Sequence, residues 1–337
     1  MRSIDTLARV PEAPVEALQD VLQAQAPRVV RGLAGAWPLV QASQASDAAA
    51  VAYLLRFANP AQPVVATIAP PEAEGRIFYD ATMRGFNFRR EQVALQSALD
   101  RMLDACTQSE PPLVYVGATT LDTCLPGLGA ENGIDLGGRD ALASIWVGNR
   151  SRVPTHQDMP DNLACVAAGR RRFLLFPPDQ LQNLYIGPLD VTPAGQPVSL
   201  VDPLAPDLVR YPRFAQAWAH AQVAELGPGD AIFMPGMWWH HIEALEPFNI
   251  LVNYWWRRVP AWMDAPLNAL MAAILGIRQL PAHERAIWQE VFRHHVFEFD
   301  EDGVAGHIPA PARGVLAPLD ETRAANLRRR LMQRLQR

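Results

Sequence analysis

The chain has 337 residues, of which 49% are hydrophobic and 19% are charged, the balance of a globular protein. Its formal net charge of −5 argues against general nucleic-acid binding, because such binding depends on a basic surface. All 30 basic side chains are arginines, so the chain contains no lysine. This excludes enzymes that need a lysine amine, such as Schiff-base enzymes, pyridoxal phosphate enzymes and Walker-type phosphate loops.

The first 111 residues predict helices and strands that flank a larger domain. Apolar residues recur at helical spacing in segments 15–25, 48–57 and 90–106. Runs of β-branched and aromatic residues predict strands in segments 27–33, 60–70 and 75–88. The opening segment has no apolar signal core and no apolar run is long enough to span a membrane, so we expect a cytoplasmic protein without membrane contact.

Residues 112–258 predict a strand-rich domain. Strands are expected at 144–149, 162–169 and 170–176, with a proline-containing turn at 149–155. After the turn signal Gly-Pro-Gly-Asp, further strands are expected up to Trp256. Between these two groups, segment 184–222 is proline-rich and irregular. Long insertions of this kind tend to be functional, and we expect this one to form part of a lid that faces the substrate.

Three residues of this domain predict a metal site. His156 and Asp158 are two residues apart at the entrance of a predicted strand, so their side chains point to the same face. His240 follows the apolar run of a later strand and supplies a second imidazole. Two imidazoles and one carboxylate form the facial triad of ferrous oxygenases, which leaves coordination positions open for a co-substrate and dioxygen.

Residues 259–337 predict a helical region. Helices are expected at 265–277 and 281–299, followed by a terminal helix at 323–337. The terminal helix carries Leu327, Leu331 and Leu335 on one face. Apolar helices beside a barrel are usually buried against a second copy of the chain, so this region predicts a homodimer.

Four motifs carry a family resemblance: H-x-D followed by D-N from His156 to Asn162, then GRRRFLLFPPDQLQNLY, GDAIFMPGMWWHHIE and NILVNYWW. They resemble the cupin-like branch of the Jumonji C hydroxylases and are similar to those of the asparaginyl hydroxylase that modifies hypoxia-inducible factor. The resemblance is densest from about residue 113 to residue 256. It implies a mainly β fold, a double-stranded β-helix of the jelly-roll or cupin type, flanked by N-terminal α/β elements and C-terminal helices.

The resemblance also implies a metal and its ligands. Members of the family use Fe(II), 2-oxoglutarate and dioxygen, and they dimerise through their C-terminal helices. His156, Asp158 and His240 match the iron ligands. The ligand in the family is the first histidine of the pair, so His241 is expected to point away from the metal.

Further positions match residues that hold the co-substrate in the family. Asn162 and Asn253 match asparagines that line the co-substrate pocket. Tyr115 matches a tyrosine that hydrogen-bonds a carboxylate of 2-oxoglutarate, and Trp255 matches a position in the pocket wall. These four residues are therefore predicted to bind the co-substrate.

Two positions depart from the family pattern. Arg171 stands where the family usually has a lysine for the carboxylate, and a guanidinium binds a carboxylate through two hydrogen bonds. Strand alternation predicts that Arg171 points inward while Arg170 and Arg172 point to solvent. Val153 stands where the asparaginyl hydroxylase has a threonine that contacts the co-substrate, and Thr155 is the candidate to replace that hydrogen bond.

The resemblance implies an oxygenase that converts 2-oxoglutarate to succinate and CO2 while it hydroxylates a substrate. Two other functions stay open: a cupin enzyme that uses the metal without 2-oxoglutarate, and a non-catalytic cupin module that binds a sugar or peptide. The substrate itself is not specified by the sequence. We expect a protein side chain or a small molecule, because the acidic chain disfavours RNA.

Overall fold

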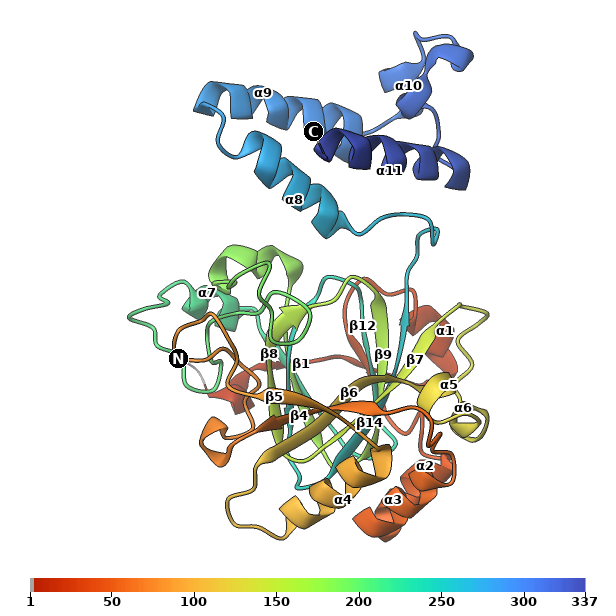
Figure 1. Ribbon diagram of the computed structural model, residues 1–337, viewed down its shortest axis with the longest axis vertical. Coiled ribbons are helices and arrows are strands. Elements are labelled where there is room, and N and C mark those ends of the chain that lie inside the picture. The colour runs from red at the N-terminus through yellow and green to blue at the C-terminus, as the bar shows by residue number, and fades with distance from the viewer. Residues whose placement is uncertain (1–2, 337) are drawn as a thin grey trace. The chain divides into compact units, whose positions relative to one another are not determined.

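The computed structural model describes residues 3–336 of the chain. These residues divide into two compact units, one that ends at Arg258 and one that begins at Val259. The first unit holds the strands and the second is helical (Figure 1). None of the helices in the described range has both the length and the apolar character needed to cross a bilayer.

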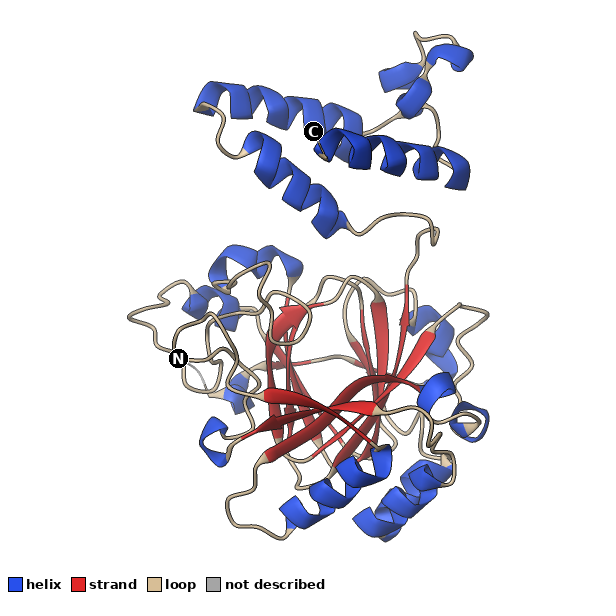
Figure 2. Ribbon diagram, viewed as in Figure 1, coloured by secondary structure: helices blue, strands red, loops and turns tan. Residues whose placement is uncertain are grey.

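Two β-sheets form the centre of the first unit (Figure 2). The last eight strands pass between them: β8, β10, β11 and β13 lie in a five-stranded sheet, and β7, β9, β12 and β14 lie in a nine-stranded sheet. This is the topology of a double-stranded β-helix, so the predicted mainly β jelly roll with flanking helices is confirmed. The eight strands are Leu142–Gly148 (β7), Ser151–Gln157 (β8), Asp161–Ala168 (β9), Arg171–Phe176 (β10), Gln222–Leu226 (β11), Ala231–Met234 (β12), Trp239–Ala244 (β13) and Asn249–Trp256 (β14).

The N-terminal segments extend both sheets and cover the larger one. Strand β1 joins the edge of the five-stranded sheet, and the other early strands join the two ends of the nine-stranded sheet. The early strands are Ala8–Arg9 (β1), Glu12–Ala13 (β2), Arg28–Val30 (β3), Val64–Ala69 (β4), Arg89–Val93 (β5) and Leu113–Thr120 (β6). The helices of this unit are Leu18–Val21 (α1), Pro38–Ala45 (α2), Asp47–Leu55 (α3), Leu95–Cys106 (α4), Leu121–Cys124 (α5), Leu128–Glu131 (α6) and Phe214–Ala219 (α7).

Two apolar layers hold this unit together. Helices α2, α3 and α4 pack on the outside of the nine-stranded sheet, where Leu39, Leu54 and Leu99 are fully buried. A second layer lies between the sheets, where Phe173 of β10 meets Ile232 of β12. Each such side chain contributes roughly 1.5–3 kcal/mol when fully buried. The layer between the sheets fixes their separation and therefore the walls of any site between them.

The structure corrects the predicted turn at 149–155. Residues from Ser151 onward belong to strand β8, which continues to Gln157. The proline that indicated a turn, Pro154, is tolerated because β8 lies at the edge of its sheet, where a missing N–H breaks no ladder. His156 therefore lies near the end of a strand, not at its entrance.

Three N-terminal predictions were also wrong in extent. The helix predicted at 90–106 begins only at Leu95, because residues 89–93 pair with β4 as strand β5. The predicted helix at 15–25 is reduced to a short 3-10 turn and α1. The predicted strand at 75–88 contains only isolated bridges, between Tyr79 and Phe86 and between Arg76 and Arg152.

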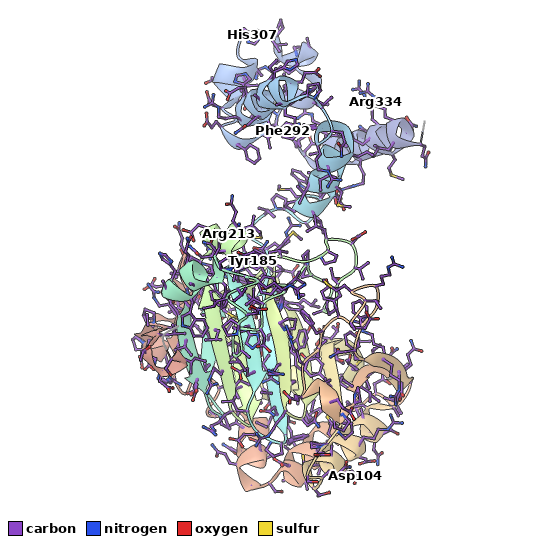
Figure 3. The ribbon with its side chains drawn as sticks, turned by 90° about the vertical axis from the view of Figure 1, so that its left-hand side faces the viewer. Asp104, Tyr185, Arg213, Phe292, His307 and Arg334 are labelled. Atoms are coloured by element: carbon purple, nitrogen blue, oxygen red, sulfur yellow. The ribbon has the colours of Figure 1, made fainter. Side chains whose placement is uncertain are left out.

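The second unit consists of helices with little interior of their own. They are Pro266–Ile277 (α8), Ala282–Phe292 (α9), Glu301–Ala305 (α10) and Glu321–Leu335 (α11), and α9 continues into a π-helical turn at Arg293–Phe297. No residue of α8, α9 or α11 is buried. Figure 3 labels Phe292, His307 and Arg334 on this unit. The predicted last residue of the terminal helix, 337, lies outside the described range.

Candidate metal centre and cavity

Three side chains converge on one point between the sheets. His156 lies near the end of β8 and His240 near the start of β13, and the antiparallel register places the two residues opposite each other. Their ring centroids are 4.3 Å apart. Asp158 follows β8, and one of its oxygens lies 3.5 Å from His240 Nε2. One ligand atom from each of the three residues lies within 4.8 Å of the others.

Both imidazoles are oriented by backbone carbonyls. His156 Nδ1 lies 2.9 Å from the carbonyl oxygen of Pro154, and His240 Nδ1 lies 3.0 Å from that of Trp238. A carbonyl oxygen only accepts hydrogen bonds, so Nδ1 carries the proton in each ring. The lone pair of Nε2 is then free to bind a metal.

The protonation states also suit a metal. Burial, together with the neighbouring His240, lowers the pKa of His156 to about 4, so this ring is neutral at pH 7. Burial alone would raise the pKa of Asp158, but its close contacts with His240 and His156 lower it to about 2. Metal ligands must be deprotonated, and these two are. Two imidazoles and one carboxylate fit a divalent transition metal.

The triad opens into a cavity of about 390 Å³ between the two sheets. This volume lies at the lower end of the range for small-molecule sites, which is about 300–1,000 Å³. The lining includes the eight residues predicted from the sequence, together with several that were not predicted. The unpredicted polar, aromatic and sulfur-containing members are Thr67, Arg90, Trp146 and Met234.

Arg171 is the buried cation of the cavity. Its side chain is only 3% exposed, and its Nε and Nη2 atoms have no hydrogen-bond partner. Burial lowers the pKa of Arg171 to about 10, so it remains charged at neutral pH, and burial raises the pKa of Tyr115 to about 12, so the phenol keeps its proton. A buried charge without a partner is costly. The arrangement therefore fits a ligand that carries a carboxylate.

The neighbours of Arg171 point away from the cavity. Arg170 pairs with Glu246 at 2.6 Å, and Arg172 pairs with Glu225 at 2.8 Å. Strand alternation on β10 accounts for the difference among the three arginines. Position 171 alone supplies a cation to the cavity from this strand.

The two asparagines form a hydrogen-bonded row in the cavity wall. Asn253 donates to Asn162 at 3.1 Å and accepts a hydrogen bond from Trp146 Nε1 at 2.7 Å. The indole of Trp255 packs edge-on against that of Trp146, and Trp255 Nε1 has no partner. The sequence did not predict Trp146 as a site residue. It lies in the strand predicted at 144–149 and pairs with Leu251 of β14, two residues from Asn253, so the pairing of β7 with β14 brings it into the cavity wall.

Two predictions about neighbouring residues have different outcomes. Val153 lines the cavity but Thr155 does not, so Thr155 cannot replace the missing hydrogen bond. The reason is a β-bulge opposite β13 that adds one residue to β8 and reverses the alternation after Val153. His241 is buried on the other face of β13, where burial lowers its pKa to about 3 and neither ring nitrogen has a partner.

The insertion at 184–222 forms part of the cavity rim. Its residues Pro193 and Ala194 line the cavity. Tyr79 donates to the carbonyl of Val191 at 2.7 Å, and Arg90 donates to that of Pro193 at 2.8 Å. Further along the insertion, Ser199 N–H donates to the carbonyl of Thr155, so the insertion also covers the free edge of β8.

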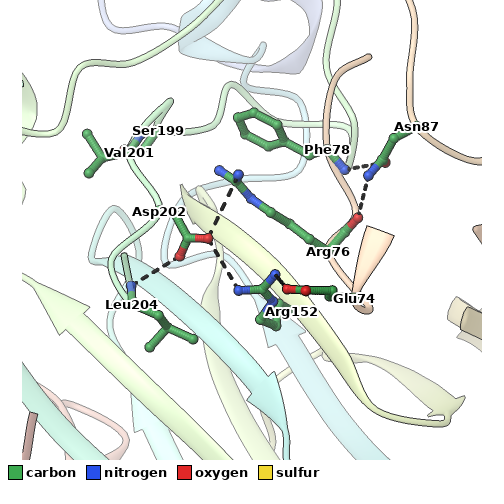
Figure 4. Close-up of polar contacts among 9 residues, drawn as sticks. All are labelled: Glu74, Arg76, Phe78, Asn87, Arg152, Ser199, Val201, Asp202 and Leu204. Carbon is green, nitrogen blue, oxygen red and sulfur yellow. Dashed lines mark hydrogen bonds and ion pairs between the residues drawn. The ribbon is translucent and has the colours of Figure 1, made fainter. Parts of the chain in front are cut away.

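Charged and aromatic contacts hold the insertion in place. Asp202 lies between two arginines, at 3.3 Å from Arg152 of β8 and 3.8 Å from Arg76 (Figure 4). Within the insertion itself, Tyr185 lies against the guanidinium of Arg213, and its hydroxyl accepts a hydrogen bond from the backbone N–H of Arg213 (Figure 3). The insertion is therefore anchored to the strand that carries His156.

Comparison with known proteins agrees with this site. A family model described as a cupin-like domain matches residues 14–261, more than half of the chain, so the chain belongs to the cupin-like family. It is similar to HSPB1-associated protein 1 of Homo sapiens (34% identity over 117 residues, 34% of this chain and 23% of that protein). It is also similar to lysine-specific demethylase JMJ31 of Arabidopsis thaliana (33% over 133 residues, 37% and 24%) and to bifunctional peptidase and (3S)-lysyl hydroxylase JMJD7 of Homo sapiens (31% over 139 residues, 36% and 43%).

These relatives confirm the resemblance to the Jumonji C hydroxylases. The chain spans less than half the length of each of these curated relatives. Their names include a hydroxylase and a demethylase, which supports an oxygenase-type enzyme.

Proposed function

We propose that this protein is an Fe(II)- and 2-oxoglutarate-dependent oxygenase that hydroxylates a protein side chain or a small molecule and releases succinate and CO2. One observation carries the proposal: a complete triad of metal ligands and an unpaired, buried guanidinium line the same cavity. The triad accounts for a metal, and Arg171 accounts for a carboxylate-bearing co-substrate. The family membership is consistent with both.

Each group of residues has a distinct task in this proposal. His156, Asp158 and His240 would hold the iron through two Nε2 atoms and a carboxylate oxygen. Bound iron, with 2-oxoglutarate and dioxygen, supplies the oxidising power that converts a C–H bond of the substrate to C–OH. The protein supplies binding, orientation and the exclusion of water.

Arg171 and Tyr115 would bind a carboxylate of 2-oxoglutarate. The guanidinium offers two unpartnered N–H groups and the phenol offers a proton that it retains at neutral pH. Charge-assisted hydrogen bonds of this type are roughly twice as strong as neutral ones. Apolar neighbours such as Val153, Ile242 and Leu251 surround this end of the cavity and keep the dielectric constant low.

The insertion 184–222 would cover the side of the cavity that the substrate enters. It supplies Pro193 and Ala194 to the cavity wall, and its contacts with Tyr79 and Arg90 tie it to β5 and to the segment before β5. We expect the substrate to approach along a surface made by these two segments. This role is part of the proposal and follows from the position of the insertion at the rim.

The direct test is succinate formation from 2-oxoglutarate by the iron-loaded protein, screened against peptide and metabolite libraries. We expect succinate to rise with a particular library fraction and a product in that fraction to gain the mass of one oxygen atom. Metal binding without 2-oxoglutarate binding would favour the other kind of cupin enzyme. Binding of a sugar or peptide with no metal requirement would favour a non-catalytic module.

A further inference from the structure

The two loops that carry Asp158 and lead to His240 are in direct backbone contact. Met237 N–H donates to the carbonyl of Asp158 at 2.7 Å. Gly236 approaches the same loop so closely that a Cβ at this position would lie 2.3 Å from the carbonyl oxygen of Met159. Real Cβ atoms do not come this close to a backbone oxygen, so only glycine fits. The spacing of these loops sets the distance between two of the three candidate ligands.

A buried carboxylate lies beside this contact without reaching the cavity. Asp161, the first residue of β9, is 7% exposed, and its Oδ1 accepts a hydrogen bond from Gly236 N–H at 2.8 Å. Its Oδ2 accepts a hydrogen bond from Nε of Arg258. Asp161 does not line the cavity, so neither the metal nor a co-substrate uses it. It links the loop before His240 to the arginine at the end of the first unit.

Arg258 in turn is held by the segment that follows helix α1. Its terminal nitrogens donate to the carbonyls of Leu22, Gln23 and Ala24, each at 3.3 Å. The next carbonyl in the chain, that of Gln25, accepts a hydrogen bond from the indole of Trp238 at 3.1 Å. Four consecutive carbonyls of residues 22–25 therefore receive hydrogen bonds from residues around the metal loops.

Trp238 connects this anchor to a metal ligand. Its indole is bound to the 22–25 segment, and its own carbonyl oxygen orients Nδ1 of His240. The carbonyl that fixes the ring of His240 is thus fixed by contacts far away in the sequence. Groups that orient ligands in this way typically change metal affinity by about 10–100-fold when they are removed.

We propose that Asp161, Arg258 and Trp238, anchored on the carbonyls of residues 22–25, form a brace that positions Asp158 and His240 for the metal. They are positioning residues, since none of them is among the three candidate ligands. The inference rests on the metal centre of the proposed function. It assigns to the N-terminal segment a role in metal affinity in addition to its role in covering the sheet.

The test compares Arg258→Ala with Arg31→Ala in the full chain. Arg31 is a matched control, because it pairs with Asp230, which also accepts backbone N–H groups, and ties an N-terminal segment to the opposite end of β12. The two arginine side chains are equally exposed, at 45% for Arg258 and 44% for Arg31. The probe is Co(II) alone. Its affinity is measured by calorimetry and its coordination by the ligand-field absorption spectrum, and Tm of the metal-free protein reports stability.

We expect Arg258→Ala to weaken Co(II) binding about tenfold or more and to change the absorption spectrum. Arg31→Ala is expected to lower Tm to a similar extent while it leaves affinity and spectrum unchanged. Asp161→Asn keeps an acceptor for Gly236 N–H but loses the charge that pairs with Arg258, so its affinity should fall between those of Arg258→Ala and the unmodified protein.

Unchanged affinity and spectrum in both Arg258→Ala and Asp161→Asn would overturn the brace. If Arg258→Ala does not fold, Asp161→Asn decides the question by the same readouts. An unmodified protein that binds no Co(II) would instead overturn the metal centre on which the brace depends, and this failure is visible before any variant is made.

Discussion

The two units of the chain bury their apolar side chains in opposite ways. In the first unit, every residue of β9 and β12 is buried, and the sheets enclose the cavity. In the second unit, α8, α9 and α11 contain no buried residue, and only Val304 and Ala305 of α10 are buried. The first unit has a core and a candidate site, whereas the helices of the second unit have little interior of their own.

This difference indicates separate tasks. A core that fixes two sheets can hold ligands at defined distances, which chemistry requires. Helices without a core gain stability only when another surface covers them. We therefore propose that residues 259–337 mediate a homodimer while residues up to 258 bind the metal and the co-substrate.

The largest effect is expected at the metal ligands of the first unit. His240→Ala should weaken Fe(II) binding by more than the roughly 10–100-fold that the loss of a supporting group costs, because it removes a ligand atom. His241→Asn is the matched control, since His241 lies on the other face of β13 and lines no part of the cavity. Anaerobic Fe(II) titration of both variants measures the difference. Loss of binding in His241→Asn with retention in His240→Ala would contradict the assignment.

A smaller but still large effect is expected at Arg171. Removing a buried partner of a carboxylate costs about 2–5 kcal/mol, so Arg171→Met should weaken 2-oxoglutarate binding at least tens-fold. Arg170→Met should have little effect, because Arg170 pairs with Glu246 outside the cavity. Calorimetric titration of the metal-loaded variants with 2-oxoglutarate measures both. Equal weakening in the two variants would exclude Arg171 as the specific anchor.

Arg171 is also expected to lower the stability of the ligand-free protein while it strengthens the binding of 2-oxoglutarate. Burial lowers its folded-state pKa to about 10, below that of an exposed arginine, so at neutral pH the charged form is less favourable in the folded than in the unfolded chain. We expect Arg171→Met to raise Tm of the ligand-free protein. In the unmodified protein, 2-oxoglutarate at 100 times its Kd should add about 2.7 kcal/mol of stability, and at the same concentration this gain should fall to about 1 kcal/mol or less in the variant. Thermal scans of both proteins with and without 2-oxoglutarate measure these two changes.

The sequence was most informative where short-range rules apply. Side chains two residues apart share a strand face, which is why His156 and Asp158 could be paired before the structure was known. The inward direction of Arg171 follows from the same rule. The family motifs supplied the fold itself, because no periodicity in the chain distinguishes a jelly roll from another β sandwich.

The sequence did not predict the features that depend on pairing between segments far apart in the chain. Pro154 indicates a turn locally, but the neighbouring strand β13 makes it part of an edge strand. The β-bulge in the same strand turns Thr155 away from the cavity, and no local signal announces it. The hydrogen bonds from Arg258 to residues 22–24 join segments far apart in the chain, which composition and spacing cannot reveal.

The second unit provides the next test, through charge placed on its apolar surface. Leu270 and Leu331 are 47% and 50% exposed, and buried apolar area contributes about 25 cal/mol per Å². Leu270→Glu or Leu331→Glu should shift the solution mass from dimer to monomer and leave Fe(II) affinity unchanged. Val209→Glu is the control, since Val209 is an isolated, 96% exposed residue of the first unit. Light scattering at micromolar concentration measures the mass, and a monomeric unmodified protein would contradict the proposed dimer.

The smallest effect is expected in hydrogen exchange on dilution. The amides of β9 and β14 lie in the middle of the nine-stranded sheet and are buried, so they exchange only through global opening. The helices α8 and α11 contain no buried residue, so in the proposed dimer the second copy would protect their amides. Diluting the protein below the dissociation constant of the dimer should therefore speed exchange in α8 and α11 while β9 and β14 stay unchanged. Mass spectrometry of peptides from the four elements reports this, and a uniform response would mean that the two units fold as one.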